Sequence, residues 1–248
     1  MRPAIATVFF VLVGLTFNSA NASFLDEQLL YSRVRDAYKF KKDTIVSQLK
    51  EMNLITSNFQ VLVKAYKYEE RVRVFVKSKT EKKWRLYQDI QICSNSGTLG
   101  PKRMQGDMQV PEGYYTINHF NPYSNFHLSL GISYPNKSDR LKSTAKDKGG
   151  AIYMHGNCVT IGCIPITDEP IKEIYILCVM AKSAGQVNIP IHIFPFDYSE
   201  IKMQVAKEKY PEHIVFWENL FEAEKRFQED SIQVPVSVNE KGDYFIGS

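Results

Sequence analysis

The spacing of apolar residues changes near residue 58, and this change constrains the fold more than any other feature of the chain. From residue 24 to residue 52, apolar side chains recur three and four positions apart with charged residues between them, which predicts one or two amphipathic helices. Residues 59–66 and 71–77 instead read as strands, the second with clean apolar–polar alternation. The chain is therefore predicted to place a helical segment in front of a sheet.

The strand pattern continues to about residue 195. Further strands are predicted at residues 84–93, 114–120, 126–132, 151–155 and 187–195, and two prolines in the last favour a sheet edge. Residues 94–113 are rich in Gly, Pro and Ser and predict a long loop, and residues 134–150 predict a polar surface excursion. Thr167 is expected to cap a helix that ends near residue 183. Residues 199–209 and 214–228 are also predicted to be helical, before a hairpin-like tail.

Residues 1–22 have the features of a secretory signal peptide. Arg2 precedes the apolar residues 4–17, and Ala20-Asn21-Ala22 fits the small-x-small rule for cleavage. The apolar run is shorter than the ~20 residues that cross a bilayer, so cleavage is favoured over a membrane anchor. We expect a mature chain that begins near Ser23, lies outside the cytoplasm and has no stable membrane span.

The charge of the chain argues against nucleic acid as a partner. The formal net charge is +4 and falls to +3 when Arg2 leaves with the signal peptide. Such a mild excess is far from the strongly basic balance of nucleic-acid-binding proteins. The mature chain is long enough to bury one substantial core.

Residues 155–163 place a potential base close to a potential sulfur nucleophile. His155 and Cys163 stand at the two ends of this run, each beside a glycine, Gly156 and Gly162. A thiol has an ordinary pKa of about 8.5, and a nearby imidazole can increase its ionised fraction. On spacing alone, packing residues or metal ligands remain alternatives to a catalytic pair. With Cys158, the run still offers too few ligands for zinc, so no metal or other cofactor is predicted.

The four cysteines are Cys93, Cys158, Cys163 and Cys178, and four cysteines allow three full pairings. Cys163 must be free if it is the nucleophile. Cys93 and Cys178 lie in apolar runs and are interpreted as buried hydrophobic residues. Cys158 could pack, assist the site, or bond reversibly to Cys163, and packing is the favoured interpretation.

An ordered series of motifs resembles the L,D-transpeptidase family, whose catalytic domain is of the YkuD type, and most closely its YafK-like branch. The resemblance covers most of the chain from about residue 58. It is carried by Ser96-Gly97, Gly100-Pro101-Lys102, Gly106-Asp107, Pro111-Glu112-Gly113-Tyr114, Tyr134-Pro135-Asn136, Asp139-Arg140, the run from His155 to Cys163, Thr167-Asp168, and tail residues 235–238 and 242–244.

The resemblance implies a mixed, mainly β fold with flanking helices. Residues 58–197 would form a β-sandwich catalytic domain of the L,D-transpeptidase type. Residues 23–57 would form an N-terminal helical segment, and residues 198–248 a C-terminal helical extension with a short hairpin tail. Together with the signal peptide at residues 1–22, these segments account for the whole chain.

The resemblance also implies the chemistry. Cys163 would attack the carbonyl at the L-centre of meso-diaminopimelate in peptidoglycan stem peptides and form a thioester, with His155 as the general base. The backbone N–H groups of Gly162 and Cys163 would form an oxyanion hole, and Gly156 would let the chain turn after the base. This chemistry uses no cofactor, and its setting would be the periplasm.

Four further residues are weaker candidates for contacts with the substrate. Arg140 could pair with a substrate carboxylate or form a structural ion pair with an acid such as Asp139. Lys102 could contact substrate or be a solvated loop charge. Tyr134 could wall the cleft or belong to the core, and Asn157 could orient His155 or cap a turn.

Ile161 stands where typical family members carry a second histidine, and this departure leaves the acyl acceptor open. Some members of the YafK-like branch are amidases that release outer-membrane lipoprotein from the wall. We favour this release, with the wall-linked lipoprotein as a second partner, over cross-linking of stem peptides or attachment of lipoprotein. The remaining alternatives are a non-catalytic murein-binding protein and a metal or redox module built on Cys158 and Cys163.

Overall fold

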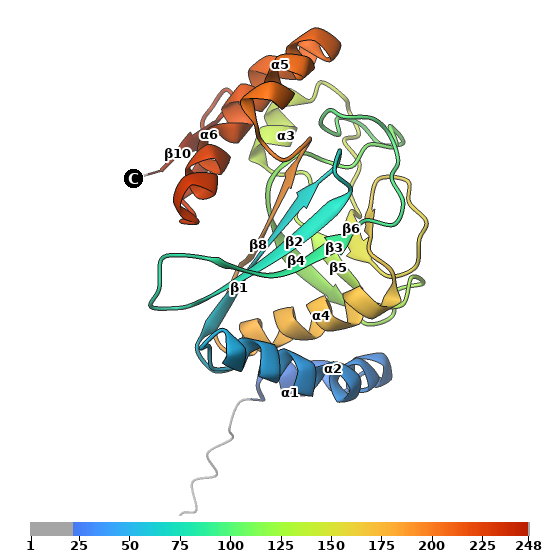
Figure 1. Ribbon diagram of the computed structural model, residues 1–248. Coiled ribbons are helices and arrows are strands. Elements are labelled where there is room, and N and C mark those ends of the chain that lie inside the picture. Colours follow the sequence, from blue (N-terminus) through green and yellow to red (C-terminus); the bar gives the residue numbers. More distant parts are fainter. Residues whose placement is uncertain (1–21, 248) are drawn as a thin grey trace, which may run out of the picture.

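The computed structural model describes residues 22–247, so residues 1–21 of the predicted signal peptide lie outside the described part. One large sheet occupies the centre, with helices α1, α2 and α4 together at one side and α5 and α6 at another (Figure 1). The helices are α1 Phe24–Gln28, α2 Ser32–Glu51, α3 Lys137–Lys142, α4 Asp168–Ser183, α5 Glu200–Lys209 and α6 Ile214–Asp230, with a short 3-10 turn at Pro211–His213. Within residues 22–247, no helix is both long and apolar enough to cross a bilayer.

The strands form one continuous sheet of eight in the order β3-β2-β1-β8-β4-β5-β6-β7, plus a separate hairpin in the tail. They are β1 Phe59–Tyr66, β2 Arg71–Ser78, β3 Arg85–Gln91, β4 Gly113–Asn121, β5 Ser129–Ile132, β6 Tyr153–His155, β7 Ile164–Pro165 and β8 Ile189–Phe194, with β9 Val236–Val238 and β10 Tyr244–Ile246 in the hairpin. The sheet is large and curled, and the predicted mixed fold with flanking helices is confirmed.

Alternation along the strands gives the sheet two different faces. In β8, Ile189, Ile191 and Ile193 enter the main core, in which α2 and α4 are also buried. Phe194 lies on the other face and packs with Trp217 of α6 in a second core. The C-terminal helices therefore cover this second face over β1 and β8, where Phe227 of α6 also packs with Leu62.

Strand β8 lies in the middle of the sheet, so the predicted sheet edge at residues 187–195 is wrong. It pairs in parallel with β1 and antiparallel with β4. Its prolines are tolerated because Pro190 precedes the residues that pair with β1 and Pro195 follows the strand. Val61 of β1 precedes the residues that pair with β8, and the side chain of Gln186 bonds its backbone instead. Oε1 of Gln186 accepts the Val61 N–H and Nε2 donates to the Val61 carbonyl, each at 2.8 Å.

Two local predictions also need correction. Thr167 precedes α4 as predicted, but its side chain makes no capping hydrogen bond and its φ is 64°. The predicted surface excursion at residues 134–150 contains the helix α3. A reciprocal capping box between Asn136 and Asp139 caps the N-terminus of this helix. Ser138 and Asp139 of this helix are buried, because α3 packs under the C-terminal hairpin through the Ser138 hydroxyl and Gly242 carbonyl (2.6 Å).

Candidate active site

Strand pairing places His155 and Cys163 on the same face of the sheet. β6 and β7 are parallel, with Met154 opposite Ile164 and His155 opposite Pro165, and Cys163 immediately precedes β7. Since alternate residues share a face, His155 and Cys163 project together, while Met154 and Ile164 are buried in the core on the other side. Both His155 and Cys163 line one cavity of about 530 Å³.

The His155 imidazole is held in one orientation. Its Nδ1 lies 2.5 Å from the carbonyl oxygen of Gly156, and a carbonyl can only accept, so Nδ1 carries the proton. Nε2 is then the atom with a free lone pair. The ring of Phe126 stacks on the imidazole, with centroids 4.7 Å apart and planes at 28°. His155 is only 1% exposed.

Burial shifts the two side chains in opposite directions and leaves both neutral. It lowers the pKa of His155 below its ordinary value, with the Gly156 carbonyl opposing. It raises the pKa of the Cys163 thiol, opposed by the backbone N–H of Tyr153 and by the charge of Lys102. The resting pair is therefore a thiol, whose Sγ contacts the Ala151 carbonyl oxygen at 3.9 Å, and an unprotonated imidazole, which is the protonation state that a general base needs at neutral pH.

The two N–H groups predicted to form an oxyanion hole both donate to the hydroxyl oxygen of Thr160. The distances to Thr160 Oγ1 are 2.8 Å from the Cys163 nitrogen and 3.1 Å from the Gly162 nitrogen. The Thr160 hydroxyl donates in turn to the Cys163 carbonyl at 2.8 Å. A substrate oxygen would have to displace the hydroxyl oxygen in order to use these two donors.

The two glycines of the run are required for different reasons. Gly162 has a φ of 131°, and a Cβ there would meet the Gln109 carbonyl oxygen at 3.0 Å. The turn predicted at Gly156 is made by Asn157, which has a φ of 59°. A Cβ at Gly156 would instead lie 2.5 Å from Asp168 Oδ1, the oxygen that accepts the Asn157 N–H at 2.8 Å.

A disulfide joins Cys93 to Cys158, so packing is the wrong interpretation for both residues. The bond spans 65 positions of sequence and ties the segment after β3 to the run between His155 and Cys163. Cys163 and Cys178 are free cysteines. Cys178 is fully buried, as predicted, and burial raises the pKa of its thiol, so Cys163 is the free thiol of the two that a molecule in the cavity can reach.

None of the described residues that line the cavity is an Asp, Glu, Lys or Arg. Asn121 at the end of β4, and Ser124 and Asn125 from the β4–β5 connection, contribute amide and hydroxyl groups, whereas Val159 and Ile161 contribute exposed apolar groups. Among residues 22–247, no three His, Cys, Asp or Glu side chains gather as a metal site would require. The β4–β5 contributors are missed from the sequence because they lie in a connection without periodicity, and Ser129 opposite His155 is the exception that strand alternation could have found.

The four weaker candidates do not line this cavity. Lys102 is 3% exposed, and its Nζ binds Asp107 Oδ1 at 2.5 Å and the Met104 carbonyl at 2.9 Å. Tyr134 is a core residue whose hydroxyl donates to the Lys148 carbonyl at 2.8 Å. Arg140 is exposed and donates to the Pro135 carbonyl. Asn157 shapes the turn, because its Oδ1 accepts the Cys158 N–H at 2.6 Å.

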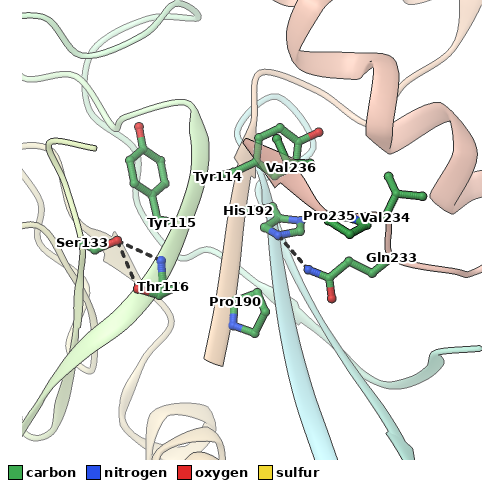
Figure 2. A pocket seen from close by; sticks show the side chains of 10 residues that line it. All are labelled: Tyr114, Tyr115, Thr116, Ser133, Pro190, His192, Gln233, Val234, Pro235 and Val236. Atoms are coloured by element: carbon green, nitrogen blue, oxygen red, sulfur yellow. Dashed lines mark hydrogen bonds between the residues drawn. The ribbon is translucent and has the colours of Figure 1, made fainter. Parts of the chain in front are cut away.

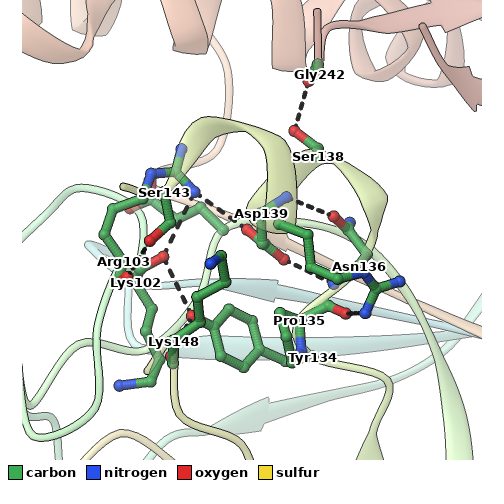
Figure 3. A network of polar contacts seen from close by, with 12 residues as sticks. Lys102, Arg103, Tyr134, Pro135, Asn136, Ser138, Asp139, Ser143, Lys148 and Gly242 are labelled. Carbon is green, nitrogen blue, oxygen red and sulfur yellow. Dashed lines mark hydrogen bonds and ion pairs between the residues drawn. The ribbon is translucent and has the colours of Figure 1, made fainter. Parts of the chain in front are cut away.

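The ion-pair partner of Asp139 is Arg103, at 3.1 Å, rather than Arg140 (Figure 3). Asp139 is 1% exposed, and its carboxylate also accepts the Tyr115 hydroxyl and the Asn136 N–H, both at 3.0 Å. Burial nevertheless raises the pKa of Asp139 to about 6, although these hydrogen bonds and the Arg103 charge each lower it.

This raised pKa predicts a pH-dependent stability. The folded protein holds the Asp139 proton more tightly than the unfolded chain, in which the pKa of this carboxyl is near 3.8. The protonated carboxyl therefore stabilises the folded state fully below pH 3.8, and this stabilisation is lost as pH rises through about 6. Relative to Asp139→Asn, the free energy of unfolding should therefore fall by roughly 2 kcal/mol between pH 4 and pH 7. Urea unfolding of both proteins across this range measures the difference, and a constant difference would contradict the assignment.

A second cavity of about 420 Å³ lies between β4, β8 and residues 233–236 (Figure 2). His192 lines it, packs edge-on against Tyr114 at 4.7 Å, and has its Nε2 3.4 Å from the Gln233 amide nitrogen. Burial lowers the pKa of His192 well below its ordinary value, so the imidazole is neutral. Neither His155 nor Cys163 lines this cavity.

Comparison with known proteins identifies the family. Residues 62–193, more than half of the chain, match the family model of the L,D-transpeptidase catalytic domain, YkuD. The "Putative L,D-transpeptidase YafK" of Escherichia coli strain K12 is 32% identical over 180 residues, which are 72% of this chain and 70% of that protein.

Solved structures with a similar arrangement include two bacterial proteins. The helical cell shape determining protein Pgp2 (K307A mutant) of Campylobacter jejuni aligns with a TM-score of 0.44 and 17% identity, over 64% of this chain and 59% of that one. Bd1075 of Bdellovibrio bacteriovorus aligns with a TM-score of 0.41 and 18% identity, over 69% of this chain and 61% of that one. On the extent of the family-model match and of the identity to YafK, this chain belongs to the L,D-transpeptidase family.

Proposed function

We propose that this protein is a periplasmic cysteine enzyme that forms a thioester at the L-centre of meso-diaminopimelate in peptidoglycan stem peptides. We further propose that water is its main acyl acceptor, so that it acts as an amidase on wall-linked lipoprotein. The observation that carries the proposal is that Cys163 and His155 project from one face of the sheet into one cavity. The disulfide between Cys93 and Cys158 supports an oxidising compartment such as the periplasm.

The proposed reaction begins when Nε2 of His155 takes the Sγ proton of Cys163. The sulfur attacks the carbonyl carbon, and the negative charge that develops on the carbonyl oxygen is met by the N–H groups of Gly162 and Cys163 once Thr160 Oγ1 is displaced. The intermediate collapses, the C–N bond breaks, and the leaving amine receives its proton from the His155 imidazolium. Water then loses a proton to Nε2 and attacks the thioester, which releases a carboxylate and restores the thiol.

The composition of the cavity favours water over an amine as the acceptor. An amine acceptor is a cation at neutral pH and must be bound and deprotonated before it attacks. None of the described lining residues carries a negative charge that would hold such a cation. Water needs no counter-charge, and the Asn and Ser side chains of the cavity offer hydrogen-bond partners for it.

The second candidate is the transpeptidase reaction, in which an amine of diaminopimelate or of a lipoprotein lysine resolves the same thioester. The name of the E. coli relative at 32% identity favours it. Both candidates share Cys163 and His155 and differ only in the final attack. A non-catalytic murein-binding protein is the third possibility that the experiment must separate.

Purified sacculi that carry covalently bound lipoprotein provide the test. We expect the mature protein to release lipoprotein and to leave a free carboxyl group on diaminopimelate, identified by mass spectrometry of the digested wall. New links between diaminopimelate residues without release would instead establish the transpeptidase. Binding to sacculi with no new product would establish the non-catalytic alternative.

A further inference from the structure

An arginine of the N-terminal helical segment reaches the wall of the catalytic cavity. Arg33 lies in the first turn of α2, and its Nη1 donates to the Ser124 carbonyl at 2.5 Å and to the His127 carbonyl at 2.8 Å. These two carbonyls belong to the connection between β4 and β5, more than 90 positions away in sequence. One guanidinium nitrogen therefore bridges two points of the same loop.

Phe126 lies between the two bridged residues and covers the imidazole of His155. Its ring stacks on that of His155 at 4.7 Å, and its backbone N–H is bonded to Ser124 Oγ at 3.0 Å. Phe126 is itself 37% exposed, so packing from the solvent side does not hold it in place. The backbone contacts of Arg33 on either side of it, at residues 124 and 127, therefore help to fix its position, together with Leu128, which is buried in the main core.

The helix that carries Arg33 is firmly attached to the rest of the fold. Val34 and Ala37 of α2 are buried in the main core. Just before Arg33, Tyr31 packs edge-on against Tyr123 at 5.2 Å, and Tyr123 also lines the cavity. Arg33 thus extends from a fixed support to the connection that carries Phe126.

We propose that Arg33 is a positioning residue for catalysis: by clamping the carbonyls of Ser124 and His127, it holds Phe126 on the His155 imidazole and so fixes the general base in its reactive orientation. The proposal rests on the proposed function only in taking His155 as the base. It assigns to the N-terminal helical segment a part in building the active site.

The clamp acts through packing rather than through the charge of Arg33. The pKa of His155 is lowered by burial, and the only opposing contribution is the Gly156 carbonyl. The charges of Asp168, Lys172, Arg33 and Glu169 act instead on the neighbouring His127. Loss of the clamp should therefore raise the pKa of His155, because the imidazole becomes accessible to water when Phe126 moves.

Arg33→Met tests the clamp, because methionine keeps the aliphatic stem and removes every donor. Arg35→Met is the matched control, since Arg35 lies on the same helix and also donates to two carbonyls, those of Leu29 and Leu30 (3.1 and 2.8 Å), but within the N-terminal segment. NMR titration of His155, assigned with His155→Gln, should show its pKa raised toward the ordinary range in Arg33→Met and unchanged in Arg35→Met.

The kinetic readout is lipoprotein release from sacculi. Arg33→Met should lower kcat by on the order of tenfold with little change in KM, because a misplaced base slows the chemical step, and Arg33→Lys should recover part of the loss. Phe126→Ala leaves the backbone clamp in place and should reproduce the His155 shift, which keeps the test valid if Arg33→Met folds poorly.

The outcomes separate this inference from the proposed function. If the wild type releases no product but Arg33→Met shifts the titration of His155, the proposed function fails and the clamp stands. If the wild type is active and a folded Arg33→Met leaves the His155 titration and kcat unchanged, the clamp is overturned, whatever Phe126→Ala shows. If Arg33→Met does not fold, an unchanged His155 titration and kcat in Phe126→Ala overturn it.

Discussion

Cys163→Ala is expected to lower product formation from sacculi by about 10⁴-fold or more. Among residues 22–247, the substitution removes the only free thiol that lines the cavity, and alanine cannot form a covalent intermediate. Binding of sacculi should persist, because the cavity keeps its other lining residues. Quantitative mass spectrometry of the products and a sacculus pull-down measure the two effects.

Cys178→Ala is the matched control for this experiment. It also removes a free thiol, but Cys178 is fully buried in α4 and cannot meet a substrate. Its activity should remain within a few fold of wild type, with a modest loss of stability from the small cavity that the substitution leaves. Cys163→Ala protein that retains wild-type activity would refute the thioester mechanism for every candidate acceptor.

Removal of the disulfide should cost about 4 kcal/mol in the free energy of unfolding. The bond between Cys93 and Cys158 closes a loop across 65 positions of sequence, and such a link restricts the unfolded chain strongly. The double variant Cys93→Ser/Cys158→Ser is the appropriate test, since a single substitution would leave a thiol able to pair with Cys163. Urea unfolding should show the loss.

Reductant provides the control for the disulfide. Dithiothreitol should destabilise the wild type by a similar amount and leave the double variant unaffected, because the other two cysteines are free. The double variant should also lose activity, since Cys158 anchors the run between His155 and Cys163. Equal stability of wild type and double variant, in the absence of reductant, would show that the link contributes nothing.

Most secondary structure could be predicted because it depends on local periodicity. Strand β1 is predicted at its observed bounds, and α4 and α5 within one residue. Helix α3 was detectable as well, since Asn136 and Asp139 have the spacing of a capping box. It is missed because the surrounding residues 134–150 are polar and their composition suggests a loop.

Long-range relations could not be predicted from local patterns. The prolines near β8 argue for an edge. The sheet accommodates them because the pairing with β1 begins at Ile191, after Pro190, and the strand ends before Pro195. The adjacent Asp139 and Arg140 suggest an ion pair, but the folded chain brings Arg103 to Asp139 instead. The disulfide partner of Cys158 likewise depends on which strand end lies beside it, and this is a property of the whole sheet.

The residues alone indicate which groups the candidate site contains, but not the bounds of the strands that carry them: β6 begins at Tyr153 rather than at residue 151, and β7, directly after Cys163, is not predicted. A histidine and a cysteine in one short run, with the surrounding motifs, were sufficient to indicate the family and the candidate residues. Folding adds that both side chains share one face, that Nε2 of His155 is the unprotonated nitrogen, and that burial favours the neutral form of both groups. It also brings Arg33, far away in sequence, to the carbonyls of Ser124 and His127 on either side of Phe126. The physical reason is that orientation, burial and protonation depend on neighbours supplied by distant segments, and no local pattern of residues records those neighbours.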